Sequence, residues 1–245
     1  TVTDTDSTLT DTMTVTVTIT GANDAPVFSD GATASASIAE GETTVATYAA
    51  TDVDDSASVT YSVSGGADSA LFSVVSTSGA LSFSTAPDYD SGSACAAGNS
   101  CVVELTASDT VETDTITVTV TITDINDNTP IFTDGDTASA SVAEGATTVG
   151  TYAATDADGS STHNTVTYTN TGGADTALFA VASSTGALTF STAPDYDSGS
   201  ACAAGNSCVV ILTATSGSLT DTITVTVAIT DINDNTPIFT DGDTA

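Results

Sequence analysis

Carboxylates in this sequence are gathered into short motifs, and each motif occurs twice in the same order. The motifs are a Glu in Ala-Glu-Gly, an Asp-x-Asp pair, an Asp-Tyr-Asp pair and an Asp-Ile-Asn-Asp-Asn stretch. Their residues are Glu40 and Glu144; Asp52, Asp54, Asp156 and Asp158; Asp88, Asp90, Asp195 and Asp197; and positions 124–128 and 231–235. Calcium takes roughly six to eight oxygen ligands from carboxylates, amides and carbonyls. Taken jointly, the motifs predict calcium sites.

Other interpretations of these motifs were weighed against calcium. Asp-Gly and Asn-Asp pairs form ordinary turns, so Asp-x-Asp or Asp-Tyr-Asp alone fits a turn as well as a ligand. The stretch from Asp124 begins like an EF-hand loop, but Thr129 and Gly135 stand where Gly and Glu are required. Two Asp-Gly-Asp triplets are interpreted as solvated turns: 134–136 and 241–243.

The charge of the chain limits its partners. Its 245 residues include 32 acidic side chains, no Lys, no Arg and one His, a formal net charge of −32. Nucleic acid and anionic membrane surfaces are excluded, because both need a basic footprint. No nucleophile–base pair is evident, so we predict no enzyme. His163 lies in a three-residue insertion of the second copy and is interpreted as an exposed loop residue. No apolar run approaches the ~18 residues of a membrane span.

The four cysteines form two identical Cys-Ala-Ala-Gly-Asn-Ser-Cys loops, Cys95/Cys101 and Cys202/Cys208. A zinc site needs four ligands, and one His cannot complete two sites. A disulfide closing each loop is favoured, worth roughly 2 kcal/mol by loop entropy. Cross-links between chains remain the alternative. Disulfides imply an oxidising, extracytoplasmic location.

The chain repeats itself at an offset of 107 residues. Residues 79–103 recur at 186–210 with one difference, Ser82 against Thr189. Residues 125–132 recur at 232–239, and a looser copy occupies 22–28. We expect C-terminal strands of a preceding repeat at 1–21, complete repeats at 22–124 and 125–231, and a linker with the first strand of a following repeat at 232–245. This organisation predicts that the chain is part of a longer array of such repeats.

Strand periodicity runs through each repeat. Ile116, Val118, Val120 and Ile122 alternate with Thr, which indicates a half-buried antiparallel strand. The second repeat predicts strands near 138–143, 147–154, 165–170, 178–182, 187–191, 208–214 and 222–230, and no helix. Seven short strands in ~105 residues are typical of an immunoglobulin-like β-sandwich. The candidate core is Phe72, Phe83, Leu105 and Tyr61, with Phe179, Phe190, Leu212 and Tyr168 in the second copy.

The set of motifs resembles the cadherin repeat, in the manner of bacterial cadherin-like tandem domains. The resemblance rests on Glu40, Asp52-Val-Asp54, Asp88-Tyr-Asp90, Asp109 in Leu-Thr-Ala-Ser-Asp, and 124–128 followed by Pro130-Ile-Phe132. It covers essentially the whole chain. It implies an all-β fold of tandem, cadherin-like Greek-key β-sandwiches with seven strands per repeat.

The resemblance also implies Ca²⁺ at each linker, usually three ions. Two ions would be held by Glu40, Asp88, Asp90, Asp127, Asp158 and the carbonyl of Ile125. A third would be held by Asn126, the carbonyl of Asn128, Asp156, Asp158 and the carbonyl of Asn164. The preceding linker would use Asn23, Asp24, Asp52, Asp54 and Asp109. The following one would use Glu144, Asp195, Asp197, Asn233, Asp234 and Asn235.

Several residues depart from the family pattern. Asp90 and Asp197 stand where the family usually has Glu, and Ser216 replaces the carboxylate of Asp109 in the second copy. The first linker begins with Gly21. We therefore expect two firm ions and a weaker third at 124–128. The Trp used in the family's strand-exchange adhesion is absent.

Two functions follow as hypotheses. The first is a calcium-rigidified extracellular rod, secreted or surface-anchored, which serves as an adhesin stalk or filament. Its partners would be neighbouring repeats of the same chain, other copies in a fibre, or a surface ligand. The alternative is a polysaccharide-binding or spacer module of a large secreted surface protein or enzyme. Sugar stacking would need exposed aromatic residues, and Trp is absent.

Overall fold

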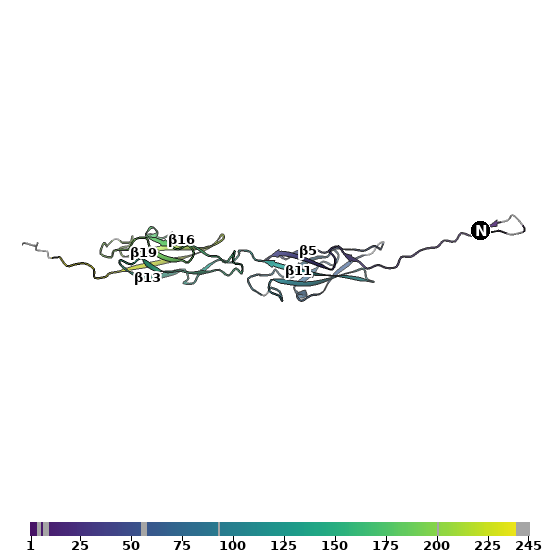
Figure 1. Cartoon of the computed structure of the whole chain (residues 1–245), viewed down its shortest axis with the longest axis horizontal. Coiled ribbons are helices and arrows are strands. Elements are labelled where there is room, and N and C mark those ends of the chain that lie inside the picture. The colour runs from purple at the N-terminus through teal and green to yellow at the C-terminus, as the bar shows by residue number, and fades with distance from the viewer. Residues whose placement is uncertain (4–5, 7–9, 55–57, 93, 200, 239–245) are drawn as a thin grey trace, which may run out of the picture. The chain divides into compact units, whose positions relative to one another are not determined.

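The computed structural model describes residues 1–3, 6, 10–54, 58–92, 94–199 and 201–238 (Figure 1). Strands and turns dominate it, with two single-turn 3₁₀ helices. The chain divides into two compact units. The first comprises Thr1–Ile38, Thr43–Ala86 and Cys95–Thr121, and the second Ala39–Glu42, Pro87–Ala94 and Ile122–Ala245. The repeat boundaries expected at 22, 125 and 232 stay a prediction.

The first unit is built on two sheets and a short strand pair. One sheet has the order β4 (Thr33–Ala39), β11 (Thr113–Thr123), β10 (Ser100–Ser108), β7 (Thr60–Gly65). The other has the order β5 (Thr44–Thr47), β9 (Ala80–Phe83), β8 (Phe72–Val74). Strand β3 (Val27–Phe28) pairs with β6 (Ala50–Thr51), and the 3₁₀ turn η1 spans Ser69–Leu71.

The second unit repeats this plan. Its larger sheet has the order β13 (Thr137–Ala143), β20 (Leu219–Thr230), β19 (Ser207–Ser216), β16 (Thr167–Gly172). Its smaller sheet has the order β14 (Thr148–Thr151), β18 (Ala187–Phe190), β17 (Phe179–Val181), and β12 (Ile131–Phe132) pairs with β15 (Ala154–Thr155). Strand β13 runs parallel to β20, whereas the other paired strands of these sheets are antiparallel. The all-β sandwich class is thereby confirmed.

Two features of the second unit differ from the expected strands. The strand expected at 147–154 is interrupted, because β14 pairs with β18 and β15 pairs with β12. The 3₁₀ turn η2 (Thr176–Leu178) precedes β17, although no helix was expected. A turn of three residues is too short to leave a helical period in the sequence.

The core lies between the two sheets of each unit. Along β10 every second residue is buried, and Leu105 lies opposite Ile116 on β11. Phe72 and Phe83 pack with ring centroids 4.2 Å apart. In the second unit one cluster joins the smaller sheet to the larger one. The eight predicted core residues are all buried, which confirms them: Phe72, Phe83, Leu105, Tyr61, Phe179, Phe190, Leu212 and Tyr168.

Each cysteine loop is closed by its own disulfide, Cys95–Cys101 and Cys202–Cys208, with Cα atoms 5.0 Å apart in both. The intraloop pairing is thus confirmed in the structure. A buried aspartate supports each loop: the carboxylate of Asp68 accepts hydrogen bonds from the backbone N–H groups of Ala96 (2.6 Å) and Val102 (2.7 Å). The disulfide, the two hydrogen bonds to Asp68 and the backbone hydrogen bonds between Cys95 and Gly98 together hold the first loop.

The strands expected within residues 1–21 are only partly present in the structure. Strands β1 (Val2–Thr3) and β2 (Thr10–Asp11) pair, but residues 12–26 carry no strand. Val15, Val17 and Ile19 are 66%, 78% and 92% exposed. Alternation alone does not form a strand, because ladder hydrogen bonds and a buried face need neighbouring strands. The triplet 241–243 and most of the strand expected at 236–245 lie outside the described residues.

Within the residues that the structure describes, no helix has the length and apolar character needed to cross a membrane.

Candidate metal centre

Glu40 joins three separate segments of the chain. It follows β4, and its carboxylate accepts hydrogen bonds from the backbone N–H groups of Tyr89 (2.7 Å) and Ile125 (3.0 Å). Its own N–H donates to the carbonyl of Thr123 (3.0 Å). Glu40 is only 4% exposed. All these residues except β4 belong to the second compact unit. The contacts bring the Ala-Glu-Gly, Asp-Tyr-Asp and Asp-Ile-Asn-Asp-Asn motifs together.

The carboxylates in these motifs form two overlapping groups. One oxygen each from Glu40, Asp90 and Asp124 lie within 4.8 Å of one another, and so do oxygens of Asp90, Asp127 and Asp158. Asp90 belongs to both groups. With no Lys or Arg in the chain, no lysine or arginine side chain offsets these negative charges.

The pKa values reflect this crowding. Burial raises the pKa of Glu40, and the charges of Asp90 and Asp127 raise it further, against the backbone hydrogen bonds that lower it. Burial also raises the pKa of Asp90, helped by Asp124, Asp158 and Asp127. Two of the clustered carboxyl groups are thus disfavoured as anions.

Asp158 behaves in the opposite way. Burial acts to raise its pKa, but hydrogen bonds with Asn128, Asp156 and Asp127 together outweigh this effect, and the pKa lies below its usual value. Its Oδ1 accepts from the backbone N–H (3.1 Å) and side-chain Nδ2 (3.0 Å) of Asn128. Asn128 Nδ2 also donates to Asp90 Oδ2 (2.5 Å). The side-chain amide of Asn128 therefore contacts both carboxylates, and its hydrogen bonds help to lower the pKa of Asp158.

Several oxygens around these groups are buried and have no hydrogen-bond partner. They are Asp124 Oδ1, Asn126 Oδ1, Asp156 Oδ2 and Asp158 Oδ2. Asp158 is 2% exposed, and the side chain of Asp124 is 5% exposed. A buried oxygen without a partner costs about 1–3 kcal/mol, and more when charged. Bound cations satisfy carboxylate and amide oxygens of this kind, so the residue types fit calcium chemically.

The structure brings together most, but not all, of the residues expected here. Glu40, Asp90, Asp127 and Asp158 are joined in the two groups. Asp88 is in neither group; its Oδ1 accepts from the N–H of Ser91 (3.0 Å) in a local turn. The carbonyl ligands expected at Ile125 and Asn128 stay predictions.

Asp124 was recognised as an acid of the 124–128 motif but was not assigned to an ion, whereas the structure groups it with Glu40 and Asp90. Its Oδ2 accepts from the backbone N–H of Ser160 (2.8 Å) and lies 3.0 Å from Nδ1 of His163. Both partners belong to the loop with the three-residue insertion. The signal was available: where Asp124 stands, the first copy has Gly21, and the first copy also lacks the insertion. His163 is half-buried and paired with Asp124, rather than the exposed loop residue that was expected.

The residues expected at the first linker lie in the first unit and contact one another. Asn23 Nδ2 donates to Asp109 Oδ2 (2.8 Å), and the N–H of Asp24 donates to Asp54 Oδ2 (2.8 Å). The N–H of Asp54 donates to Asp52 Oδ1 (2.8 Å). Asp52 Oδ2 is buried without a partner. All five predicted residues are therefore linked into one chain of contacts.

The third set lies near the end of the described chain. Glu144, Asp195 and Asp197 each place an oxygen within 4.8 Å of the others. The carboxylate of Glu144 accepts from the backbone N–H groups of Tyr196 (2.8 Å) and Ile232 (2.8 Å), which lower its pKa. Next to it is a hollow of about 270 Å³, lined by Asp197 and by Asp231, Ile232, Asn233, Asp234 and Asn235. Asn235 Nδ2 donates to Asp197.

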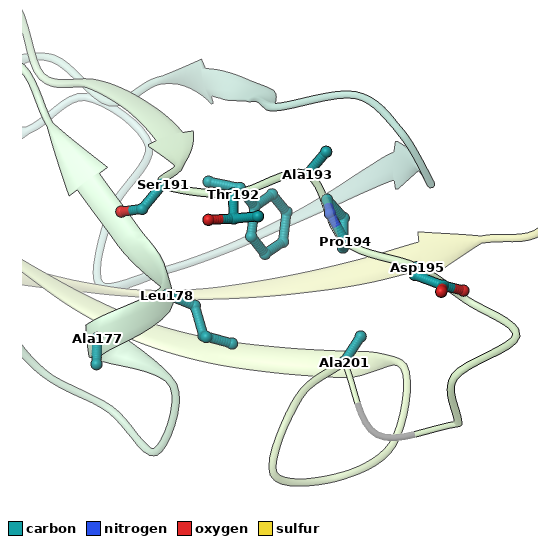
Figure 2. A pocket seen from close by; sticks show the side chains of 9 residues that line it. Ala177, Leu178, Ser191, Thr192, Ala193, Pro194, Asp195 and Ala201 are labelled. Atoms are coloured by element: carbon teal, nitrogen blue, oxygen red, sulfur yellow. The ribbon is translucent and has the colours of Figure 1, made fainter.

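A second hollow, of about 230 Å³, lies between η2 and the segment after β18 (Figure 2). Leu178, Pro194 and Ala201 form much of its wall, and Asp195 lies at one end. Its one aromatic side chain, Phe190, is buried in the core. This hollow therefore offers no exposed aromatic surface on which a sugar ring could stack.

No family model and no curated protein matches the sequence. Solved structures do match, each at probability 1.00. Human CDH23 EC21-23 has a TM-score of 0.67 at 23% identity, over 88% of this chain and 73% of that one. Mouse cadherin-23 EC22-24 has a TM-score of 0.61 at 21% identity, over 85% of this chain and 65% of that one. Drosophila N-cadherin EC1-4 has a TM-score of 0.67 at 21% identity, over 85% of this chain and 50% of that one.

The chain thus spans about half to two thirds of the length of several cadherin structures that it matches. At 21–23% identity the likeness establishes the fold. The chain has the fold of cadherin ectodomain repeats, and the resemblance seen in its motifs is confirmed at that level.

Proposed function

We propose that this chain is part of an extracellular rod of cadherin-like repeats, whose linkers are stiffened by calcium. The observation that carries the proposal is the pair of carboxylate groups around Asp90, together with the buried oxygens that have no partner. The cadherin ectodomain fold supports an adhesive or structural role outside the cell. The two disulfides support the same location, because they persist in oxidising compartments. The proposal assigns no catalytic role.

The physical role of calcium follows from the charges. Six carboxylates converge on the motifs around the linker at 124–128: Glu40, Asp90, Asp124, Asp127, Asp156 and Asp158. Without cations they repel one another, and two of them have raised pKa values. Two or three divalent ions would cancel most of this charge. They would also hold segments 39–42, 87–94 and 122–128 to the start of the second repeat, so the linker would lose its freedom to bend.

Small-angle scattering tests this proposal on the full chain, in millimolar calcium and again in excess chelator. We expect an extended, rigid particle in calcium and a broader distribution of maximum dimensions in chelator. Magnesium at the same concentration controls for ionic strength, since its octahedral preference fits flexible carboxylate cages less well.

A matched pair of variants assigns the effect to the linker. Glu40→Gln removes the carboxylate that joins three segments, whereas Glu42→Gln makes the same change at an exposed position of the same turn. We expect the first variant to reduce the calcium-dependent stiffening and the second to leave it unchanged. A scattering profile that does not respond to calcium would contradict the proposal and favour the polysaccharide-binding or spacer alternative.

A further inference from the structure

The disulfide loop of the second unit, residues 202–208, contacts the Asp-Tyr-Asp motif of the same unit. Asn206 lies in this loop, and its side-chain Nδ2 donates a hydrogen bond to the backbone carbonyl of Tyr196 (3.0 Å). Tyr196 is the middle residue of the motif, whose two aspartates form one carboxylate group with Glu144. The loop therefore contacts the backbone that carries two of the three grouped carboxylates.

Tyr196 is also held by other contacts. Its N–H donates to Glu144 Oε2 (2.8 Å), and its side chain packs against the core cluster of the second unit. Because a peptide group is planar, Glu144 orients the plane that joins the first aspartate of the motif to Tyr196. Asn206 orients the next plane, which joins Tyr196 to Asp197. Both peptide planes of the motif are thus fixed, one by the carboxylate and the other by the disulfide loop.

Asn206 contacts the strand that leads into the linker as well. Its backbone carbonyl accepts from the N–H of Ile229 (2.9 Å), one residue before β20 ends at Thr230. Residues 231–235 follow directly and line the hollow beside the carboxylate group. One residue of the loop therefore contacts both segments around this group, the motif through its side chain and the end of the strand through its backbone.

The loop holds its asparagine in a defined position. The two cysteines are 6% and 0% exposed and belong to the core cluster. The carboxylate of Asp175 accepts from the N–H groups of Ala203 (2.7 Å) and Val209 (2.8 Å). Cys202 and Gly205 exchange two backbone hydrogen bonds of 2.7 and 3.1 Å. Both ends of this short ring are anchored, so little freedom remains for the asparagine between them.

The side chain of Asn206 carries a cost that its contact with Tyr196 must offset. Its Oδ1 is buried and has no hydrogen-bond partner among the residues that the structure describes. A buried polar atom without a partner costs about 1–3 kcal/mol. An alanine would avoid this cost, so the contribution that is particular to the asparagine is the hydrogen bond that it donates to Tyr196.

We propose that Asn206 is a positioning residue for the carboxylate group that contains Asp195 and Asp197, and that the disulfide loop supports the calcium affinity of this group by holding Asn206 in place. The inference rests on the proposed calcium role of the linkers. Asn206 acts through the backbone of Tyr196 and not as a ligand. Removing a partner that orients metal ligands typically costs about 10–100-fold in affinity. Calcium binding at this group is therefore coupled to the order of the loop.

Calorimetric titration of the full chain with calcium tests this coupling. The other carboxylate sets are first silenced by Asp54→Asn, Asp109→Asn, Asp90→Asn and Asp127→Asn. In this background Asn206→Ala should weaken the remaining calcium binding by at least about tenfold. Asn99→Ala is the matched control, because it makes the same change in the identical loop of the first unit, and it should leave that binding within about twofold. A purely structural asparagine would change the stability in chelator but not the calcium affinity of the folded chain.

Hydrogen exchange in the silenced background keeps the test decisive if Asn206→Ala fails to fold. Coupling between two sites is reciprocal, so calcium should slow the exchange of the Cys202 and Gly205 amides by at least about fivefold. The amides of Cys95 and Gly98 in the first loop are the internal reference and should exchange at the same rate with and without calcium.

Three results would overturn this inference alone: an Asn206→Ala variant with unaltered affinity, loop amides whose exchange ignores calcium, or a silenced background that binds no calcium although the native chain does. A native chain that takes up no calcium would overturn the proposed function, and this inference with it.

Discussion

Gly79 lies directly against the backbone carbonyl of Tyr48. A Cβ atom on Gly79 would stand 2.1 Å from the Tyr48 oxygen, and the N–H of Tyr48 donates to the carbonyl of Gly79 at 3.0 Å. Gly79 also has a φ of +73°. We expect Gly79→Ala to destabilise the first unit by at least about 3 kcal/mol, the sum of a left-handed backbone and an overpacked contact. Urea denaturation measures this loss.

Gly31→Ala separates the two causes. Gly31 has a similar φ of +78°, but a Cβ there meets nothing within 4 Å. This variant should lose only the backbone part, about 1–2 kcal/mol. Equal losses for the two variants would show that the Tyr48 carbonyl yields to the added methyl group.

The carboxylate of Asp68 and the disulfide Cys95–Cys101 both restrain the loop between the two cysteines. Asp68 is buried, and its carboxylate accepts hydrogen bonds from the backbone N–H groups of Ala96 and Val102, which directly follow the two cysteines of the loop. Asp68→Ala should cost about 2–4 kcal/mol, because two backbone donors lose their acceptor. Removing the disulfide by Cys95→Ala and Cys101→Ala should cost roughly 2 kcal/mol.

The combination of these changes is the informative measurement. Since both contacts restrain one loop, the triple variant should lose less stability than the sum of its parts. Asp30→Ala, an exposed position in the same unit, serves as the control and should change stability by less than about 0.5 kcal/mol. Strict additivity in thermal denaturation would contradict a shared role.

Much of the fold could be predicted because its signals are local. Alternation along β10 and β11 places Leu105 and Ile116 in the core, and the short spacing of Cys95 and Cys101 suits one closed loop. The interruption between β14 and β15 could not be predicted in the same way. It depends on which strands lie alongside, because β14 pairs with β18 whereas β15 pairs with β12.

The candidate site shows the same division. Glu40 and Asp90 are recognisable from their motifs, and the structure brings them together. Asp124 is recognisable as part of its motif, but its contacts are not, because its partners Ser160 and His163 become neighbours only through the folded loop. Asp88 belongs to a recognised motif, but its carboxylate accepts a hydrogen bond from the backbone N–H of Ser91 in a local turn. A motif predicts which residue types are available, whereas backbone contacts decide which oxygens converge.

Thr110 has a φ of +86° and follows Asp109 directly. The turn is held because Asp109 Oδ1 accepts from the N–H groups of Val111 (2.7 Å) and Glu112 (2.7 Å). A β-branched residue is disfavoured in this conformation. The second copy has Gly217 here, with a φ of +55°.

We expect Thr110→Gly to raise the stability of the first unit by about 1 kcal/mol, because relief of backbone strain exceeds the added entropy of the unfolded chain. Thr113→Gly, in strand β11, should instead destabilise it. Thermal denaturation of both variants decides the matter. A loss of stability in Thr110→Gly would mean that the threonine side chain makes a stabilising contact that outweighs the strain.

Asp127 offers a test in which calcium reverses the sign of the effect. It is exposed and shares a carboxylate group with Asp90 and Asp158. Its charge contributes to the raised pKa values of Glu40 and Asp90. Asp127→Asn should therefore raise the denaturation midpoint slightly in chelator, where it relieves repulsion. In calcium it should lower the midpoint relative to the unchanged chain, because a charged ligand is lost and bound calcium stabilises the folded state less.

Asp30→Asn is the control for this reversal. It removes one negative charge from an exposed position in the other unit and should have the same small effect with and without calcium. Differential scanning fluorimetry at several calcium concentrations gives both midpoints. If Asp127→Asn shifts the denaturation midpoint as little as Asp30→Asn does, both with and without calcium, then Asp127 is a solvated turn residue. In that case Asp127 is not a ligand of an ion bound by the carboxylate group around Asp90.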